Sequence, residues 1–135
     1  MKETKQNVPD AEPVRAGVPL RCNVMAAGCP SRKVLQHLTS RWGVLVLVAL
    51  LPGTQRFSSL RRKIEGVSER MLAQTLQSLE ADGMILRRSM NTVPPHVEYT
   101  LTTLGCEAAE KIQDLVMLIE ESQTALLTSQ NPADQ

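Results

Sequence analysis

The chain has 135 residues and a net charge of only +1 at neutral pH, a length that suits one domain with a modest hydrophobic core. Its longest apolar run, Val44–Leu51, is far shorter than the roughly 20 residues of a membrane-spanning helix. Residues 1–20 are polar and lack the apolar centre of a signal peptide. We therefore expect a cytoplasmic protein with no membrane partner.

The charges are distributed unevenly. Residues 29–90 hold ten Lys and Arg against four Asp and Glu, whereas residues 91–135 hold one Lys against seven acidic residues. This asymmetry suits a protein that meets a polyanion with one face. Two solvated faces of opposite charge would give the same distribution.

Cysteine and histidine positions give little sign of catalysis. Cys22, Cys29 and Cys106 are odd in number and widely spaced, which disfavours a disulfide framework and a four-ligand zinc site. His37 and His96 stand in no metal-site or nucleophile motif, and a glycine-rich phosphate loop is missing from the sequence. We expect reduced cysteines, no metal, no cofactor and no enzymatic activity.

The first third of the chain predicts a tail and two helices. Residues 1–28 are polar, interrupted by prolines and without periodicity, which indicates a disordered tail. A first helix is predicted over 31–39. A second, over 41–51, is apolar on nearly all sides and should lie at the centre of the domain, with Pro52-Gly53 ending it.

Two further helices have the pattern of a helix-turn-helix. Ser58 is predicted to cap a short third helix, whose outer side carries three consecutive basic residues at 61–63. This basic side is either a phosphate-binding surface or an ordinary solvated face. After a turn at Gly66, a fourth helix is predicted over 68–82, with Ser68 as its N-cap and a glycine directly after its end.

The fourth helix has two distinct sides. Leu72, Leu76 and Leu79 fall at i, i+4 and i+7 and form a stripe that should be buried. The polar residues predicted to face outward include Arg70, Gln74 and Gln77. Arg and Gln side chains can form paired hydrogen bonds with base edges in a major groove. The alternative is ordinary exposed helix surface.

A hairpin should follow the fourth helix. Strands are predicted over 84–90 and 96–102, joined by a stiff turn with two consecutive prolines. A hairpin in this place forms a wing. With Arg87 and Arg88 near its base, the wing could follow the phosphate backbone or enter the minor groove.

A last helix is predicted over 103–127, followed by a polar tail at 128–135. Its long apolar stripe exceeds what a small winged domain can cover, which predicts a partner helix from a second subunit and a two-fold dimer. The alternative is that the helix folds back on its own domain. The residues predicted for the dimer interface are Leu104, Ile112, Leu115, Val116 and Ile119.

Five segments of the chain form a recognisable series: Cys29-Pro30, Leu38–Trp42, Arg56–Ile64, Val67–Gly83 and Val93–Gly105. In this order and spacing they resemble the HxlR-type bacterial transcription regulators of the MarR-like superfamily. The resemblance implies one mainly helical, winged helix-turn-helix domain over 29–127 with a small β-hairpin wing. It also implies a homodimer, joined through its N- and C-terminal helices, that binds a palindromic double-stranded DNA operator. The pattern leaves open whether the regulator represses or activates its genes.

Pattern and resemblance together give a set of candidate DNA contacts. They are Arg56, Ser58, Arg61, Arg62, Lys63, Ser68, Arg70, Gln74, Gln77, Arg87, Arg88 and His96. Many relatives carry an aromatic and an acidic residue before Val-Pro-Pro, where this chain has Met90, Asn91 and Thr92, so no contact is carried over at these three positions. The alternative function is a winged-helix module that binds another protein without specific DNA binding.

Cys29 is the candidate sensor. It precedes a predicted helix N-terminus, with Arg32 and Lys33 one turn later, and both features favour a reactive thiolate. Some members of the family respond to oxidants, quinones or aldehydes through a cysteine next to this proline. The resemblance implies the same role for Cys29 and an oxidant or small-molecule effector. The alternative is a purely structural cysteine.

Overall fold

The computed structural model of the protein describes residues 23–134. It divides into two compact units, whose boundary falls between Gln36 and His37. The described part of the first unit consists of turns followed by most of α1 (Pro30–Leu38). Most of the predicted tail at 1–28 lies outside the described residues. Among those described, no helix has both the length and the hydropathy of a membrane span.

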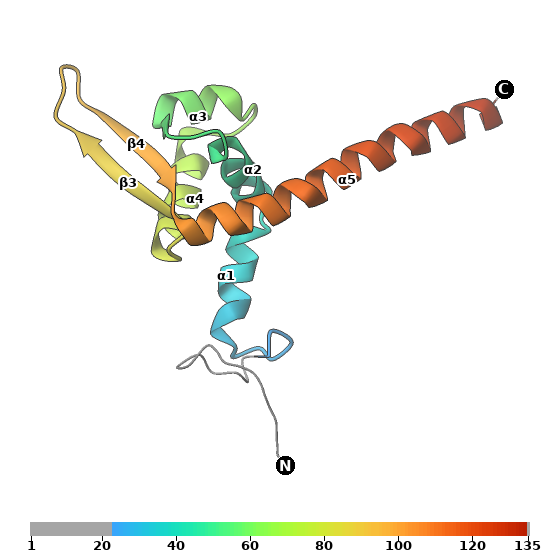
Figure 1. Ribbon diagram of the computed structural model, residues 1–135, viewed down its shortest axis with the longest axis horizontal. Helices are drawn as coiled ribbons and strands as arrows, with labels where there is room; N and C mark the ends of the chain where they lie inside the picture. The colour runs from blue at the N-terminus through green and yellow to red at the C-terminus, as the bar shows by residue number, and fades with distance from the viewer. Residues whose placement is uncertain (1–22, 135) are drawn as a thin grey trace, which may run out of the picture. The chain divides into compact units, whose positions relative to one another are not determined.

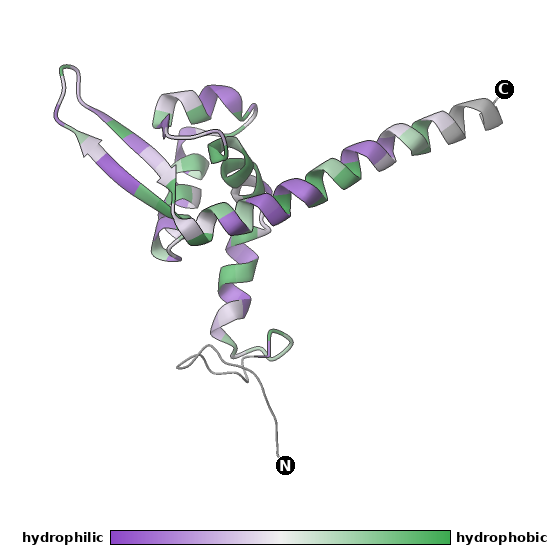
Figure 2. Cartoon of the chain, viewed as in Figure 1, coloured by the Kyte–Doolittle hydropathy of each residue, from purple (hydrophilic) through white to green (hydrophobic). Residues whose placement is uncertain are grey.

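The core of the second unit forms around α2 (Arg41–Leu50), as its apolar sequence predicted. Val46, Leu47 and Leu50 are almost completely buried, and α2 packs against both α4 and α5. The hydrophobic colouring of α2 is visible in Figure 2. The helix begins at Arg41 because the side chain of Ser40 accepts a hydrogen bond from the first-turn amide of Gly43 at 3.1 Å.

The helix-turn-helix consists of α3 (Phe57–Lys63) and α4 (Glu69–Ala81). Ser68 caps α4, since its Oγ accepts a hydrogen bond from the Met71 amide at 3.0 Å. At the other end, Gly83 has φ of +81°, a left-handed conformation that glycine adopts at low cost after a helix. Both predicted ends of α4 are therefore confirmed.

The predicted cap of α3 was wrong. This helix begins at Phe57, so Ser58 lies inside its first turn, and Arg56 at the N-cap makes no capping hydrogen bond with its side chain. The reason is the chain just before it. Gln55 and Arg56 form a short strand, and their backbone direction is set by pairing with another strand rather than by a cap.

Within the described residues the wing sheet has three strands in the order β2-β4-β3. The predicted hairpin is confirmed as β3 (Ile85–Met90) and β4 (His96–Leu101), which pair antiparallel. The additional strand β2 (Gln55–Arg56) pairs with β4. A strand of two residues is too short to show the alternation of apolar and polar side chains, so the sequence did not predict it.

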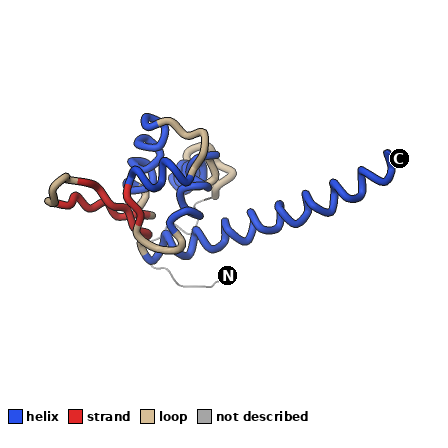
Figure 3. The backbone as a smooth tube through the Cα atoms, turned by 90° about the horizontal axis from the view of Figure 1, so that it is seen from above, coloured by secondary structure: helices blue, strands red, loops and turns tan. Residues whose placement is uncertain are grey.

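The last helix, α5 (Thr103–Asp134), runs beyond the end predicted at Leu127. Directly before its first residue, Thr102 Oγ1 accepts from the Gly105 amide at 2.9 Å and donates to the Gly83 carbonyl at 2.7 Å. Its first turns pack against α2 and bury Ala109. Every side chain from 117 to 128 is exposed, and this part of α5 projects from the rest of its unit (Figures 1 and 3).

Candidate nucleic-acid interface

The two predicted sides of α4 are confirmed. Leu72, Leu76 and Leu79 are at most 1% exposed. On the opposite side, Arg70, Gln74 and Gln77 are all exposed. These three side chains repeat at i, i+4 and i+7, so they form one continuous row along the outside of the helix. Arg can donate two hydrogen bonds to one base edge, and Gln can donate one and accept one.

The basic side of α3 lies beside the first turn of α4, where this row begins. Leu60 is buried, and the three basic residues after it are exposed. They are Arg61, Arg62 and Lys63. A hollow of about 400 Å³ lies next to them, lined by Phe57, Ser58, Arg61, Arg62, Val67 and Glu69. The structure therefore brings the basic residues of α3 and the first turn of α4 together at one hollow.

Arg61 has a partner on this surface. Its Nη1 lies 3.4 Å from Glu69 Oε2, and the two side chains are 49% and 72% exposed. An ion pair so open to water contributes little stability, so Arg61 can exchange the carboxylate for a phosphate at low cost. Ser68 also keeps bonding capacity, because its Oγ accepts in the helix cap while the hydroxyl hydrogen can be donated elsewhere.

The two arginines of the wing that were predicted to contact DNA lie on opposite faces of its sheet. Successive residues of a strand point to opposite faces, so Arg87 and Arg88 cannot lie on the same face of the sheet. Arg87 pairs in register with the buried Tyr99, on the face that meets the core. Arg88 pairs with Glu98, and Glu98 also pairs with Arg56 of β2. Arg56, Glu98 and Arg88 thus form a row across the other face.

His96 is more enclosed than a free surface cation. Its side chain is 17% exposed, and Nε2 lies 3.1 Å from Glu98 Oε2. Nδ1 lies 3.1 Å from the hydroxyl of Thr92. Thr92, to which the sequence assigned no role, therefore helps to position a candidate contact.

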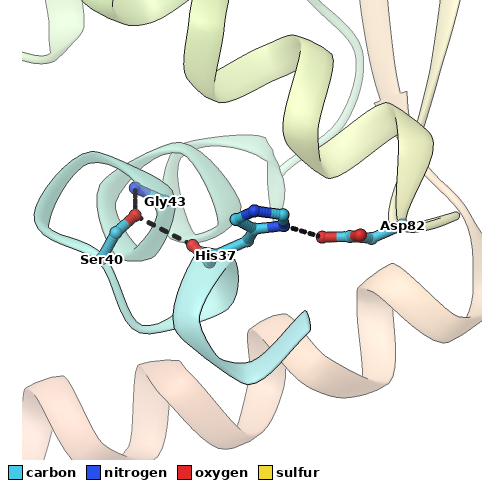
Figure 4. Close-up of polar contacts among 4 residues, drawn as sticks. All are labelled: His37, Ser40, Gly43 and Asp82. Carbon is cyan, nitrogen blue, oxygen red and sulfur yellow. Dashed lines mark hydrogen bonds and ion pairs between the residues drawn. The ribbon is translucent and has the colours of Figure 1, made fainter. Parts of the chain in front are cut away.

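A contact that the sequence did not predict fixes the end of α4. His37 Nδ1 lies 2.7 Å from Oδ2 of Asp82, the C-cap residue of α4 (Figure 4). The His37 carbonyl also accepts a hydrogen bond from Ser40 Oγ at 2.9 Å. Gly43 passes this carbonyl so closely that a Cβ there would lie 2.1 Å from it. Residues 37–40 therefore contact both the start of α2 and the end of α4.

The stripe predicted for the dimer interface divides into two sides. Ile112 and Val116 are half-buried on the side of α5 that packs within its own unit. Leu104, Leu115 and Ile119 are 50–54% exposed. Ile112 and Val116 are therefore less exposed than the other three residues, and the dimer interface itself stays a prediction.

Cys29 also differs from its expectation. It is 8% exposed and lies directly before α1 as predicted, but it is disulfide-bonded rather than a free thiolate. Cys106 is a free, half-buried thiol. Within the described residues, no cluster of His, Cys, Asp and Glu could hold a metal ion.

Comparison with known proteins now decides the family. The family model for the HxlR-like helix-turn-helix matches residues 37–125. The chain belongs to this family. Its members are helix-turn-helix transcriptional regulators and not enzymes, so the family and the absence of enzymatic activity are as the sequence predicted.

Individual relatives agree with this assignment. The HTH-type transcriptional regulator YtfH of Escherichia coli K12 is 62% identical over 98 residues, which are 73% of this chain and 78% of YtfH. The structure of YtfH from Salmonella typhimurium matches with a TM-score of 0.75 and 56% identity, covering 81% of this chain and 97% of that one. The redox regulator HypR, in its oxidized form, matches with a TM-score of 0.63 and 31% identity over 69% of this chain and 96% of HypR. This HxlR-like protein is therefore a winged helix-turn-helix transcriptional regulator.

Proposed function

We propose that this HxlR-like protein acts in the cytoplasm as a homodimer that binds a palindromic double-stranded DNA operator with sequence specificity. The observation that carries the proposal is that the exposed basic side of α3 meets the first turn of α4, where Arg61 contacts Glu69 and the exposed polar row of α4 begins with the next residue. The first has the charge that phosphates need, and the second has the hydrogen-bonding groups that base edges need.

The two surfaces have separate roles. Arg61, Arg62 and Lys63 bind phosphates and set the position of the domain on the duplex, and Ser58 and Ser68 can donate hydrogen bonds to the same backbone. Arg70, Gln74 and Gln77 enter the major groove and read bases. Gln74 is in the middle of the exposed row. We therefore expect its contact to contribute most to the preference for one base over another.

The wing supplies a further set of backbone contacts. Arg56 and Arg88 stand on one face of the sheet, on either side of Glu98. His96 lies on β4, near the exposed turn of the wing. Arg87 is on the other face, so we assign the phosphate contacts of the wing to Arg56, Arg88 and His96 before Arg87.

Dimerisation is proposed to occur through α5. Large apolar side chains are at least 46% exposed along its projecting part: Leu115, Met117, Leu118, Ile119, Leu126 and Leu127. A contiguous exposed apolar surface of this kind marks an interaction site. A second copy of the same helix is the simplest cover, since an isologous contact gives the two-fold symmetry that a palindrome requires.

A gel-shift series on the DNA upstream of the protein's own gene tests this proposal. We expect one dimer to bind an inverted repeat whose half-sites lie about 10 base pairs apart, so that both α4 helices enter the groove on one side of the duplex. Inserting about five base pairs between the half-sites should abolish the shift. Equal binding to both spacings would contradict the dimeric arrangement.

A second proposal concerns the effector. HypR, a relative of the same fold, is a redox regulator, and Cys29 takes part in a disulfide directly before α1. We infer that operator binding depends on the oxidation state of Cys29. In protein that has first been reduced, diamide would take up two electrons and two protons as Cys29 and a second thiol form a disulfide. Operator binding by Cys29→Ser, with and without diamide, tests this, and Cys106→Ser is the matched control. A wild-type response retained in Cys29→Ser would contradict it.

A further inference from the structure

Glu69 is an acidic residue on the surface that is proposed to bind DNA. It is the first residue of α4, and it lines the hollow beside the basic side of α3 together with Arg61 and Arg62. Of the described residues that line this hollow, Glu69 alone is acidic. Its side chain is 72% exposed. A carboxylate in this place repels the phosphates that the neighbouring arginines attract, so its presence on this surface needs a separate explanation.

Helix stability explains part of the choice of residue. The N-terminus of a helix carries a partial positive charge, and an acidic residue in the first turn stabilises it. The cap of α4, however, is made by Ser68, whose Oγ accepts from the Met71 amide. Among the described residues, the Glu69 side chain has its hydrogen bond and its ion pair with Arg61 only. Stability therefore accounts for an acidic charge in this turn, and it leaves the carboxylate oxygens of Glu69 open to a further partner.

The ion pair between Arg61 and Glu69 is lost when Arg61 binds a phosphate. Nη1 and Oε2 lie 3.4 Å apart, and both side chains are open to water, so the pair is weak. Once Arg61 has turned to the DNA backbone, the Glu69 carboxylate has no partner and lies close to phosphates. An ionised carboxylate can only accept hydrogen bonds. In the major groove, the groups that donate hydrogen bonds are the amino groups of cytosine and adenine.

The position of Glu69 in α4 favours contact with one of these amino groups. In helix-turn-helix complexes, residues at the N-terminal end of the second helix contact base edges in the major groove. Ala73, one turn later on the same side of α4, is exposed and ends at its methyl group, so it leaves room for a base beside Glu69. The edge of cytosine presents its amino group, whereas adenine presents the N7 acceptor next to its amino group. A carboxylate therefore favours cytosine over adenine, because N7 repels its second oxygen.

We propose that Glu69 is a specificity-determining residue that accepts a hydrogen bond from the amino group of one cytosine in each half-site of the operator. On DNA that lacks this cytosine, the carboxylate faces phosphates without a donor or keeps Arg61 away from them. Both effects lower the affinity for other sequences, so Glu69 adds specificity by weakening the wrong complexes. This proposal rests on the proposed DNA binding and names one base that the site selects.

Binding of wild type and Glu69→Gln to the upstream duplex, and to every single-base variant of one half-site, tests the proposal. In the wild type, replacing one cytosine with any other base should lower the affinity about tenfold. Glu69→Gln should prefer adenine at the same position, because the amide can donate to N7 and accept from the amino group. It should also bind a shuffled duplex several-fold more tightly than wild type, since one repulsive charge is gone. A cytosine preference that Glu69→Gln retains would overturn the proposal.

Glu65→Gln is the matched control for the loss of one negative charge. Glu65 is exposed in the turn before α4 and lines a different hollow, beside α2, so this variant should keep the base preference of the wild type. Urea denaturation of Glu69→Gln measures the contribution to helix stability separately. Lower stability with an unchanged base preference would show that Glu69 serves the helix alone. A wild type that prefers no duplex over another would refute the proposed function and this proposal with it, whereas a wild-type preference that Glu69→Gln keeps refutes this proposal only.

Discussion

The outer face of the helix-turn-helix and the projecting half of α5 are both open to water, yet they expose opposite kinds of side chain. On α3 and α4 the leucines are buried, and arginine, lysine and glutamine are exposed. On α5, large apolar residues such as Leu118 and Ile119 remain exposed at 50–58%. Exposed cations indicate a polyanionic ligand, whereas exposed aliphatic side chains indicate a protein partner. One chain thus has one surface suited to DNA and another suited to its own copy.

The largest effect should come from placing a charge on the α5 surface. Ile119→Asp should give a monomer, because a carboxylate at a subunit contact loses its water without gaining a partner. Operator affinity should drop by about 100-fold, since two linked domains bind far more tightly than one. Light scattering and gel shifts measure the two results. Thr124→Asp, at an exposed polar position of the same helix, is the control. A monomeric Ile119→Asp with undiminished affinity would show that operator binding does not require the contact through α5.

A smaller and more selective effect is expected from the polar row of α4. Gln74→Ala should cost about 1–3 kcal/mol at one operator position and relax the preference there. Glu80→Ala, at an exposed position near the other end of α4, should leave that preference intact. Binding to a set of single-base operator variants provides the measurement. An unchanged preference in Gln74→Ala would mean that another side of α4 faces the bases.

The basic side of α3 should behave differently from the row on α4. Arg62→Ala should weaken binding several-fold on every duplex and reduce the salt dependence by about one counterion, because a phosphate contact carries no sequence information. Lys111→Ala removes an exposed cation from α5 and should change neither quantity. Loss of sequence preference in Arg62→Ala would show that this residue contacts bases.

The smallest effect concerns the N-terminus of α4. Ser68→Ala removes the hydrogen bond to the Met71 amide and should lower the free energy of unfolding by about 1 kcal/mol. Ser58→Ala is the matched control, since Ser58 lies inside α3 and does not cap it. Urea denaturation measures both. A similar loss in the two variants would argue against a specific role for the Ser68 cap.

Local patterns predicted the parts of the fold that depend on neighbours in sequence. The leucine spacing gave the two sides of α4, Ser68 gave its first turn and Gly83 its end. The wing followed from two alternating segments around a proline turn. Each of these features is fixed within about one helical turn or one hairpin.

Features that depend on distant residues were not predictable in the same way. The contact of His37 with Asp82 joins positions 45 apart, and β2 has only two residues. The stripe on α5 gave the apolar positions correctly, but helical periodicity cannot say which of them the domain itself covers. Ile112 and Leu115 therefore looked equivalent in sequence and differ in burial.

The exposed face of α3 and α4 is proposed to read a DNA sequence. Fluorescence anisotropy titrations of an upstream duplex and a shuffled duplex, at 50 to 200 mM salt, test it most directly. We expect the affinity for both duplexes to fall steeply with salt, while the upstream duplex remains at least about 1,000-fold preferred. Equal affinity for the two duplexes at every salt concentration would contradict it and favour a winged helix that binds another protein instead.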